Sequence, residues 1–522
     1  MKQAKIIFVT GGVISSLGKG IIAASVARLL KDQGLHVNMM KCDPYLNVDP
    51  GTMSPIEHGE VFVTEDGGET DLDIGHYERF LGQNLNKSCS LTSGRVYQNV
   101  LNKEREGLYL GKTVQVVPHI TNEIKENILL NTIGFDVLFV EVGGTVGDIE
   151  SLPYLEAIRQ MQIEEDTFLI HGAYLPYLKA SKELKTKPVQ HSVKELQGLG
   201  IRPNMIVTRN EIPITKKEKD KISMFCNVPH SHVVESVDVA SVYEVPLKMK
   251  EQGVDKIVAE HFGFALKDST HSKLKEVVDS LYHSKGSTTI AIVGKYTALE
   301  DSYMSIIESL KHAGIVNKIK VNTLLISAQE FKTSDLEGVS GIIVPGGFGS
   351  SGIEGKLQAI KYARENDIPF LGICLGMQLA CLEFANNVCG LSVSHGEINP
   401  EHPNQIVHIL EGQDLTNLGG TQRLGSYECK LSKNTLARAI YGSSVANERH
   451  RHRYEFNSEY KKVLEEKGLV FSGVNPQTNL VEIIENSANK FFVAVQFHPE
   501  LTSKLTDPNP LFVALVKSTI EV

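Results

Sequence analysis

The sequence has few cysteines, and their spacing excludes two common uses of the residue. It has seven cysteines in 522 residues and no Cys-x-x-Cys pair. An odd number of thiols cannot all be paired, so neither a disulfide framework nor a zinc site of the usual spacing is expected. Unpaired cysteines are typical of a reducing compartment, and we therefore expect a cytoplasmic protein.

Long apolar runs and an excess of positive charge are also absent. The first apolar run, residues 6–10, stops at Gly11-Gly12, too early for the core of a signal peptide. No run has the length that a membrane-spanning helix needs. The formal net charge of −9 gives no support for nucleic-acid binding. We expect neither a membrane nor a nucleic acid among the partners.

What is present is the pattern of an α/β protein with more than one domain. A chain of 522 residues is too long for a single core and predicts two or three domains. Strand-like runs alternate with helix-like segments, which favours mostly parallel sheets. The expected strands include 6–10, 37–40, 137–142, 168–170 and 205–207, then 289–293, 341–345 and 370–373. A polar segment with helical spacing, 266–285, predicts the domain boundary before the strand at 289.

The segment Gly372-Ile-Cys374-Leu-Gly376 predicts a nucleophile. An apolar run ends in Gly-x-Cys-x-Gly, and a helix-like segment, 377–385, follows. This is the nucleophile-elbow pattern with cysteine in place of serine, and the helix N-terminus favours the thiolate. A buried small hydrophobic residue is the commoner role of a single cysteine. However, a strand at 491–497 ends in His498-Pro-Glu500, which supplies a base and a carboxylate to orient it.

A second motif, at the N-terminus, predicts a phosphate-binding loop. A strand at 6–10 leads into a glycine-rich loop that ends in Ser15-Ser-Leu-Gly-Lys19-Gly20, and a helix with one apolar face follows. Backbone N–H groups of such a loop bind phosphate oxygens, and Lys19 adds a charge. The match to a P-loop is imperfect, because Gly20 stands where a Ser or Thr normally contacts Mg²⁺. We expect Asp73 and Glu141, the latter at the end of an apolar strand 135–140, to hold the metal instead.

Two further loops are candidates for nucleotide contacts. The segment 141–151 is rich in glycine and acids and follows a strand directly. The segment 185–194, Lys-Thr-Lys-Pro-Val-Gln-His-Ser-Val-Lys, is basic and could bind a second polyphosphate. Either segment alone is more often a solvated surface loop.

Together these motifs resemble the CTP synthase family over nearly the whole chain, residues 5–516. The resemblance rests on SSLGKG at 15–20, KCDPYLNVDPGTMSP at 41–55, HGEVFVTEDGGETDLDIGHYERF at 58–80, YLGKTVQVVPHIT at 109–121, EVGGTVGDIESLPYLEAIRQ at 141–160, KTKPVQHSVKEL at 185–196, PGGFG at 345–349, GICLGMQ at 372–378, RHRYEFN at 451–457 and QFHPE at 496–500. It implies a P-loop-like amidoligase domain at 1–266, a linker at 267–287 and a class I glutamine amidotransferase domain at 288–522.

The resemblance implies a two-step reaction. Glutamine is hydrolysed at Cys374, His498 and Glu500, and ammonia passes through a channel gated at His58. ATP phosphorylates O4 of UTP, and ammonia displaces the phosphate to give CTP. Mg²⁺ as cofactor, GTP as activator, CTP as feedback inhibitor and a homotetramer are implied in the same way.

The site residues carried over from the family fall into three groups. Those implied for ATP are Ser16, Leu17, Gly18, Lys19, Gly20, Lys41 and Asp73, with Asp73 and Glu141 for the metal. Those implied for UTP or CTP are Ser15, Asp148, Ile149, Glu150, Lys185, Thr186, Lys187, Pro188, Val189, Gln190 and Lys221. Those implied for glutamine are Gly347, Leu375, Gly376, Met377, Gln378, Glu397 and Arg453, with the N–H groups of Gly347 and Leu375 at the oxyanion.

Some positions depart from the family pattern. Val189 replaces a threonine, Ser350-Ser351 replaces a segment with arginine, and Ser394-His-Gly-Glu397 replaces Asn-Ser-Thr-Glu. Two alternatives stay open. The chain could be another ATP-dependent glutamine amidotransferase, such as a cobyric acid synthase-like enzyme, or a non-catalytic homologue kept as a filament subunit.

Overall fold

The computed structural model describes residues 4–267, 271–410, 413 and 420–520. The chain forms two compact units. The first contains the residues up to Pro50 together with Asp73–Val278, and the second contains Gly51–Leu72 together with the residues from Asp279 on. Sequence reasoning did not anticipate that Gly51–Leu72, from the first half of the chain, belongs to the second unit.

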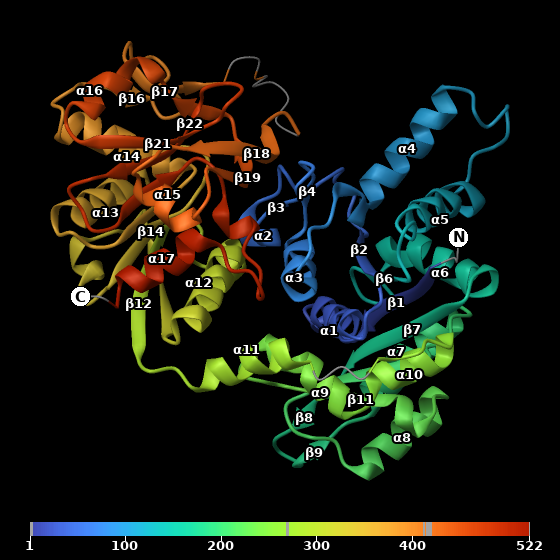
Figure 1. Ribbon diagram of the computed structural model, residues 1–522. Helices are drawn as coiled ribbons and strands as arrows, with labels where there is room; N and C mark the ends of the chain where they lie inside the picture. Colours follow the sequence, from blue (N-terminus) through green and yellow to red (C-terminus); the bar gives the residue numbers. More distant parts are fainter. Residues whose placement is uncertain (1–3, 268–270, 411–412, 414–419, 521–522) are drawn as a thin grey trace. The chain divides into compact units, whose positions relative to one another are not determined.

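A seven-stranded parallel sheet forms the core of the first unit (Figure 1). Its order is β11 (Val233–Val237), β10 (Met205–Asn210), β7 (Thr167–Tyr174), β1 (Lys5–Gly12), β6 (Val137–Val142), β2 (Val37–Asp43) and β5 (Ser90–Thr92). The strands are almost entirely buried, which explains their continuous apolar sequences. In register, Glu141 lies opposite both Val9 and Lys41, so β1, β2 and β6 bring their carboxyl ends to one edge.

Helices and one hairpin complete the first unit. The helices are α1 (Lys19–Asp32), α3 (Leu72–Leu81, which begins one residue before this unit), α4 (Ser93–Arg105), α5 (Thr121–Leu130), α6 (Leu152–Glu164), α7 (Lys187–Gly198), α8 (Lys216–Cys226), α9 (Val245–Glu251) and α10 (Val254–Phe262). Strands β8 (Tyr177–Leu178) and β9 (Glu183–Leu184) form an antiparallel hairpin. Helix α11 (Ser272–Tyr282) runs across the end of the unit at Val278.

The second unit is built on a nine-stranded mixed sheet. Its parallel part is β13 (Lys320–Ser327), β12 (Ser287–Gly294), β14 (Gly341–Val344), β15 (Phe370–Ile373) and β23 (Phe492–Val495). Its antiparallel part continues with β22 (Val481–Asn486), β21 (Leu469–Val474), β18 (Arg423–Leu431) and β19 (Val445–His452). A three-stranded sheet contains β16 (Ser394–His395), β17 (Gln405–Ile409) and β20 (Tyr454–Phe456).

Apolar clusters lie on the strands of this nine-stranded sheet and on the helices that pack with them. The helices are α12 (Met304–Asn317), α13 (Ile353–Glu365), α14 (Leu375–Asn387), α15 (Leu436–Tyr441), α16 (Lys461–Glu465) and α17 (Pro510–Ser518). The segment Gly51–Leu72 adds α2 (Pro55–His58) and the hairpin of β3 (Phe62–Val63) and β4 (Glu69–Thr70).

The expected α/β fold class is confirmed, with a parallel sheet in the first unit and a second sheet with its own helices in the second unit. The expected strands at 137–142 and 370–373 coincide with β6 and β15. The strand expected at 135–140 begins later, so Glu141 is part of β6 and does not follow it. Helix α11 covers much of the expected linker 267–287, of which residues 268–270 lie outside the described residues. All seven cysteines are free thiols. None of the helices in the described part of the chain is long and apolar enough to cross a membrane.

Candidate active sites

Cys374 lies on a strained turn between β15 and α14. Its backbone has φ 53° and ψ −104°, a conformation that residues with a side chain rarely adopt. Gly376 lies close to β14, and a Cβ atom at this position would be 2.1 Å from the carbonyl oxygen of Val344. Only a residue without a side chain fits there, so Gly376 permits the turn. The helix begins at Leu375, so its first amide N–H groups have no partner within the helix. The backbone therefore has the geometry of a nucleophile elbow.

His498 and Glu500 lie beside Cys374, at the carboxyl end of β23. His498 Nδ1 is 2.7 Å from Glu500 Oε1. Burial opposes the charged imidazolium, but the negative charges of Glu500 and Cys374 outweigh it and raise the pKa of His498 to about 10. The imidazole is therefore protonated at neutral pH and can act as a proton donor.

The loop 345–349 covers the nucleophile and is held by two lysines. Lys356, on α13, is almost fully buried and donates to the carbonyl oxygen of Pro345 at 3.2 Å. Burial lowers the pKa of Lys356 to about 8, and the charge of Cys374 opposes this shift. Lys295 donates to the carbonyl oxygen of Phe348 at 3.4 Å. In the described part of the chain the N–H of Gly347 has no acceptor, so it is available to an oxyanion.

A cavity of about 420 Å³ opens in front of Cys374, large enough for a small amino acid. Gly347, Glu397, Arg453 and His498 line it together with Cys374. Glu397 accepts a hydrogen bond from the N–H of Gly349 at 2.8 Å. Burial raises the pKa of Glu397, while that hydrogen bond and Arg453 oppose the shift. A carboxylate and a guanidinium thus face the same space, as recognition of an amino acid's ammonium and carboxylate groups requires.

Four predicted glutamine-binding residues do not line this cavity. Leu375, Gly376, Met377 and Gln378 form the buried first turn of α14. The carboxamide of Gln378 donates to the carbonyl oxygen of Tyr454 at 2.8 Å and accepts from His395 Nε2 at 2.9 Å. His395 is one of the departures from the family pattern. Because its imidazole is hydrogen-bonded to Gln378, this side chain is engaged inside the fold.

Residues 51–61 provide another wall of the cavity, which sequence reasoning missed. Gly51, Thr52, Pro55 and Glu60 are among the lining residues. The Arg451 side chain and the backbone N–H of Ser305 hold the segment in place. Arg451 donates to Glu69 and to the carbonyl oxygen of Gly51, both at 2.8 Å, and the N–H of Ser305 donates to Glu60 at 2.9 Å. His58 follows in the same segment, with its Nδ1 3.3 Å from Asp71.

The phosphate loop of the first unit lies between β1 and α1. Ser16 and Gly18 both have positive φ values, 55° and 85°, as in loops whose N–H groups converge on an anion. Lys19 is nearly buried and donates to the carbonyl oxygen of Gly144 at 2.5 Å. Burial lowers the pKa of Lys19, and the charge of Glu141 is the main effect opposing this. Lys41, on β2, pairs with Asp73.

The structure explains why residue 20 is glycine. A Cβ atom at Gly20 would lie 2.8 Å from Asp73 Oδ1 and 3.1 Å from Glu141 Oε2. The two predicted metal-binding carboxylates therefore converge on the place where a Ser or Thr would stand in an ordinary P-loop. Tyr77 donates a hydrogen bond to Glu141 from α3. Hard oxygen donors of this kind suit Mg²⁺, which commonly takes one or two carboxylates and completes its shell with water and phosphate.

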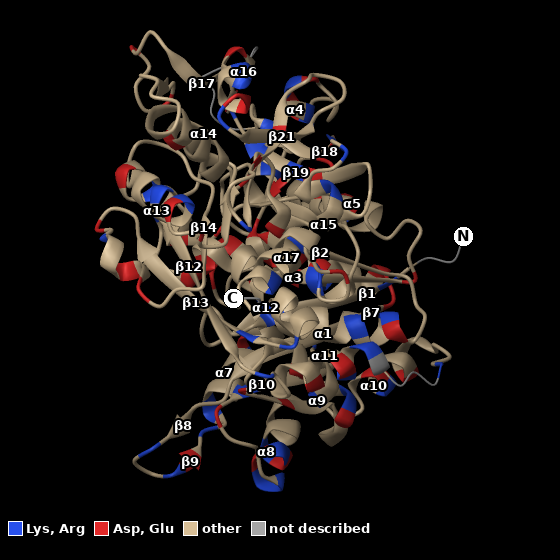
Figure 2. Ribbon diagram, turned by 60° about the vertical axis from the view of Figure 1, so that its left-hand side comes forward, with Lys and Arg blue, Asp and Glu red and all other residues tan. Residues whose placement is uncertain are grey.

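The basic segment predicted to bind UTP forms the start of α7 and the chain before it. Gln190 donates to Thr186 at 3.0 Å, and Lys185 pairs with Glu183 of β9. The hydrogen bond from Lys185 is the main cause that lowers the pKa of Glu183, and Lys221 on α8 contributes. Lysines mark both α8 and the chain between β8 and β9 in Figure 2.

The remaining predicted nucleotide residues are spread around these loops. Asp148 accepts from the N–H of Thr145 at 2.6 Å, whereas Ile149 and Glu150 are exposed. Ser15 is exposed at the phosphate loop. Val189 is fully buried in an apolar cluster with Val193 and Ile222, so its side chain belongs to the core. The loss of a threonine hydroxyl at this position removes no group from the surface.

Comparison with known proteins covers both units. Residues 5–264 match the family CTP synthase N-terminus, and residues 298–518 match the family glutamine amidotransferase class-I. The chain is 54% identical to the CTP synthase of Bacillus subtilis (strain 168), over 99% of both chains. It is 53% identical to the CTP synthase of Geobacillus kaustophilus, over 99% of this chain and 100% of the relative. A solved glutaminase domain of Trypanosoma brucei CTPS with bound acivicin is 36% identical over 45% of this chain and 94% of that one, with a TM-score of 0.42.

Proposed function

The chain belongs to the CTP synthase family of glutamine-hydrolysing ligases, and we propose that its two sites divide the amination of UTP to CTP between them. The glutaminase chemistry occurs at Cys374, and the ATP-dependent chemistry occurs at the phosphate loop around Lys19. The single observation that carries this proposal is the strained Cys374 beside His498 and Glu500, at a cavity that also presents Glu397 and Arg453.

At the first site, the thiolate of Cys374 attacks the carboxamide carbon of glutamine. The imidazolium of His498 gives its proton to the departing ammonia, and Glu500 keeps the ring oriented. The amide N–H groups of Gly347 and Leu375 stabilise the tetrahedral oxyanion. Water then cleaves the thioester with His498 as the base, and glutamate leaves. Glu397 and Arg453 bind the amino-acid end of glutamine, and the first turn of α14 with Gly376, Met377 and Gln378 supports the nucleophile.

At the second site, ATP is bound by the loop from Ser16 to Gly20 and by Lys41. UTP is bound by Ser15, by the segment Lys185–Gln190 and by Lys221, and the product inhibitor CTP also uses Asp148, Ile149 and Glu150. ATP phosphorylates O4 of the uracil ring, because a carbonyl oxygen is a poor leaving group and a phosphate is a good one. Ammonia, which passes the gate at His58, then displaces the phosphate.

Mg²⁺ is the metal that suits this site, because Asp73 and Glu141 direct carboxylate oxygens to one point beside Gly20. We propose that these two residues hold it. When bound, the ion neutralises charge on the transferred phosphoryl group. Lys19 and Lys41 neutralise the remaining phosphate oxygens from the protein side.

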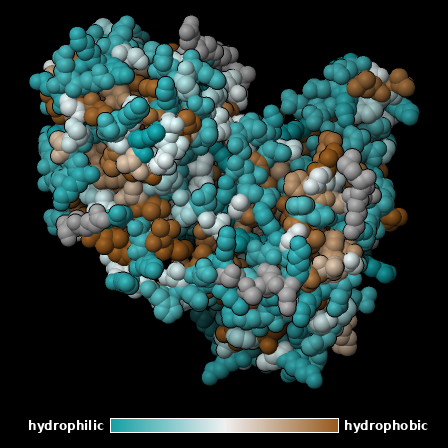
Figure 3. All heavy atoms as spheres, in the orientation of Figure 1, coloured by the Kyte–Doolittle hydropathy of each residue, from teal (hydrophilic) through white to brown (hydrophobic). Residues whose placement is uncertain are grey.

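Regulation and assembly follow the family in this proposal, with GTP as activator, CTP as inhibitor and a homotetramer. Exposed leucines on and after α4 support an assembly surface, and hydrophobic residues are visible there in Figure 3. The exposed leucines are Leu101, Leu108 and Leu110. Cytoplasmic location remains a prediction from cysteine usage.

A direct test measures CTP formed by the purified chain from UTP, ATP and Mg²⁺, with glutamine in one reaction and ammonium in another. CTP is expected from both nitrogen sources. Its absence from both, at any enzyme concentration, would contradict the proposal and leave the filament-forming homologue as the explanation. The cobyric acid synthase-like alternative is disfavoured by the match of residues 5–264 to the CTP synthase N-terminus.

A further inference from the structure

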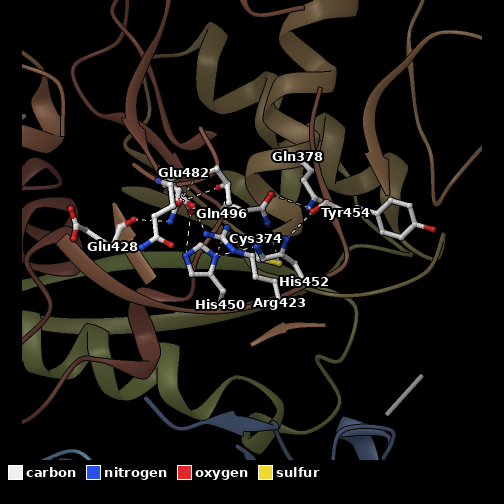
Figure 4. Close-up of polar contacts among 12 residues, drawn as sticks. Cys374, Gln378, Arg423, Glu428, His450, His452, Tyr454, Glu482 and Gln496 are labelled. Carbon is white, nitrogen blue, oxygen red and sulfur yellow. Dashed lines mark hydrogen bonds and ion pairs between the residues drawn. The ribbon is translucent and has the colours of Figure 1, made fainter. Parts of the chain in front are cut away.

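Behind Cys374 lies a group of four buried ionisable residues that the chemistry described above does not use. They are Arg423 on β18, His450 and His452 on β19, and Glu482 on β22 (Figure 4). Both histidines and Glu482 are at most 1% exposed, and Arg423 is 9% exposed. Burying charged groups this deeply destabilises the fold unless they are paired with one another.

The hydrogen positions along β19 follow from the acceptor at its end. His452 Nδ1 is 3.0 Å from the carbonyl oxygen of Tyr454, so this nitrogen must carry a hydrogen. Burial and the charge of Arg423 lower the pKa of His452 to about 3, so the ring is neutral and its Nε2 is an acceptor. His450 Nδ1, 3.0 Å from that Nε2, must therefore be the donor.

At the other end of this hydrogen-bonded series, between His450 and Glu482, one more proton is needed. His450 Nε2 is 3.2 Å from Glu482 Oε2, and neither atom has a hydrogen-bond partner elsewhere in the described structure. A neutral imidazole nitrogen and a carboxylate oxygen would face each other with lone pairs only. One proton must lie between them, on either atom. Burial raises the pKa of Glu482 to about 7 although Arg423 donates to its Oε1 at 2.8 Å.

A different assignment of these hydrogens fails. Arg423 Nη1 is 3.4 Å from His450 Nδ1 and could donate to it. His452 would then have to donate from both nitrogens and become cationic. Burial, Arg423 and His498 all oppose a second positive charge there. The ring of Tyr427, which stacks on Arg423, carries no negative charge that could balance a second positive charge.

The chain of contacts continues from Tyr454 to the nucleophile. Gln378 Nε2 donates to the carbonyl oxygen of Tyr454 at 2.8 Å and to Gln496 Oε1 at 3.1 Å. His395 donates to the opposite end of the Gln378 carboxamide, which fixes its orientation. Gln496 Nε2, in turn, is 3.7 Å from Cys374 Sγ. Every link from His450 to the sulfur thus has a defined donor and a defined acceptor.

We propose that Glu482, His450 and His452 are positioning residues that hold one shared proton and thereby fix Tyr454, Gln378 and Gln496 against the sulfur of Cys374. The inference rests on the glutaminase function proposed above. The relay needs the proton and not the negative charge of Glu482. A neutral carboxamide at this position can donate to His450 and accept from Arg423, so it reproduces the working arrangement.

The test compares Glu482→Gln with Glu482→Met in the full-length chain. For Glu482→Gln we expect kcat for glutamine hydrolysis within about threefold of the unmodified chain. For Glu482→Met we expect kcat to fall about ten- to a hundredfold with KM little changed, since buried partners are left unpaired. Alkylation of Cys374 by iodoacetamide, followed on its peptide by mass spectrometry, should fall in parallel with kcat.

A second pair of variants covers the case that Glu482→Met does not fold. His452→Asn keeps an N–H near the carbonyl oxygen of Tyr454, whereas His452→Leu removes it, so only the leucine variant should lose activity. Glu428→Gln, an exposed carboxylate on β18, is the matched control and should leave kcat unchanged. Thermal unfolding followed by circular dichroism reports whether each variant is folded, and CTP formation from ammonium, whose chemistry occurs in the first unit, should be unaffected.

Equal impairment of Glu482→Gln and Glu482→Met would overturn the inference, because it would mean that the charge itself is required. Full activity of Glu482→Met, or of His452→Leu, would overturn it as well. Failure of the proposed glutaminase function would give a different result from failure of this inference. If the unmodified chain hydrolyses no glutamine, the assignment of Cys374 fails and the relay has nothing to position.

Discussion

The two sites of this molecule are assembled in different ways. The phosphate site takes its groups from the carboxyl ends of adjacent parallel strands, where Lys41 and Glu141 lie opposite each other in register. The glutamine site gathers a strained cysteine, a histidine from another strand and a wall from residues 51–61. Binding a phosphate needs converging charges and N–H groups, which one loop and one sheet edge can supply. A nucleophile needs fixed partners on several sides, and these come from distant parts of the chain.

Replacing the nucleophile should separate the two sites most sharply. For Cys374→Ala we expect CTP formation from glutamine to fall at least about a thousandfold, because no other group can form the thioester. CTP formation from ammonium should be retained, since its chemistry occurs in the first unit. Both rates are measured in parallel with saturating ATP and UTP. Loss of both activities would mean that the two sites are not separable in this way.

Removing a metal-binding carboxylate should produce the opposite pattern. For Glu141→Gln we expect CTP formation from either nitrogen source to fall about a hundredfold or more, as the phosphoryl group loses charge stabilisation. Basal glutamine hydrolysis should remain, because Cys374 lies in the other unit. Release of glutamate and formation of CTP are assayed separately. Equal loss in both assays would contradict the assignment of Glu141.

A smaller effect is expected when a side chain is added at Gly20. In Gly20→Ser the new Cβ would press on Asp73 and Glu141, and we expect the KM for ATP to rise about tenfold, a penalty of roughly 1.4 kcal/mol. Gly198→Ser, on α7, is the control, since no atom lies within 4 Å of its Cβ position. An unchanged KM for ATP in Gly20→Ser would show that the carboxylates do not need this space.

The smallest effect concerns the charge on His498. Because its pKa is raised to about 10, the pairing of its imidazolium with Glu500 stabilises the fold fully below the usual pKa of histidine and is lost as the pH rises through 10. Glu500→Gln removes the larger of the two favourable charges. We expect iodoacetamide to alkylate Cys374 up to about tenfold more slowly at pH 7, with the difference shrinking toward pH 10. A difference that stays constant with pH would argue against this role of Glu500.

Local features of both sites were predictable from the sequence. In each apolar run that became β6 or β15, an acid or a glycine stands next to the last residue of the strand, so the strand ends were visible. The Gly-x-Cys-x-Gly turn needs small residues on both sides of the cysteine, and the structure gives the reason at Gly376. Of the acids expected near Gly20, Glu141 lies there because the carboxyl ends of parallel strands share one edge, whereas Asp73 reaches the same place from the first turn of α3.

Long-range pairings were not predictable. The register of β18, β19 and β22 is set by contacts between segments far apart in the chain, and no single segment encodes it. His452 was visible only as a letter of the motif at 451–457, and His450 lies one residue before that motif. The relation of both histidines to Glu482 depends on the register. The buried position of Val189 was equally hidden, since a basic loop and the start of an amphipathic helix look alike in sequence.

The placement of Gly51–Leu72 has a consequence for how this protein can be taken apart. The chain crosses from one unit to the other after Pro50, after Leu72 and after Val278. A gene fragment that begins near residue 279 would encode most of the glutaminase but not residues 51–61, which line its cavity. The two activities therefore do not belong to two consecutive, separable segments of the chain. Recombination, truncation or subcloning at the apparent linker would separate a substrate pocket from one of its own walls.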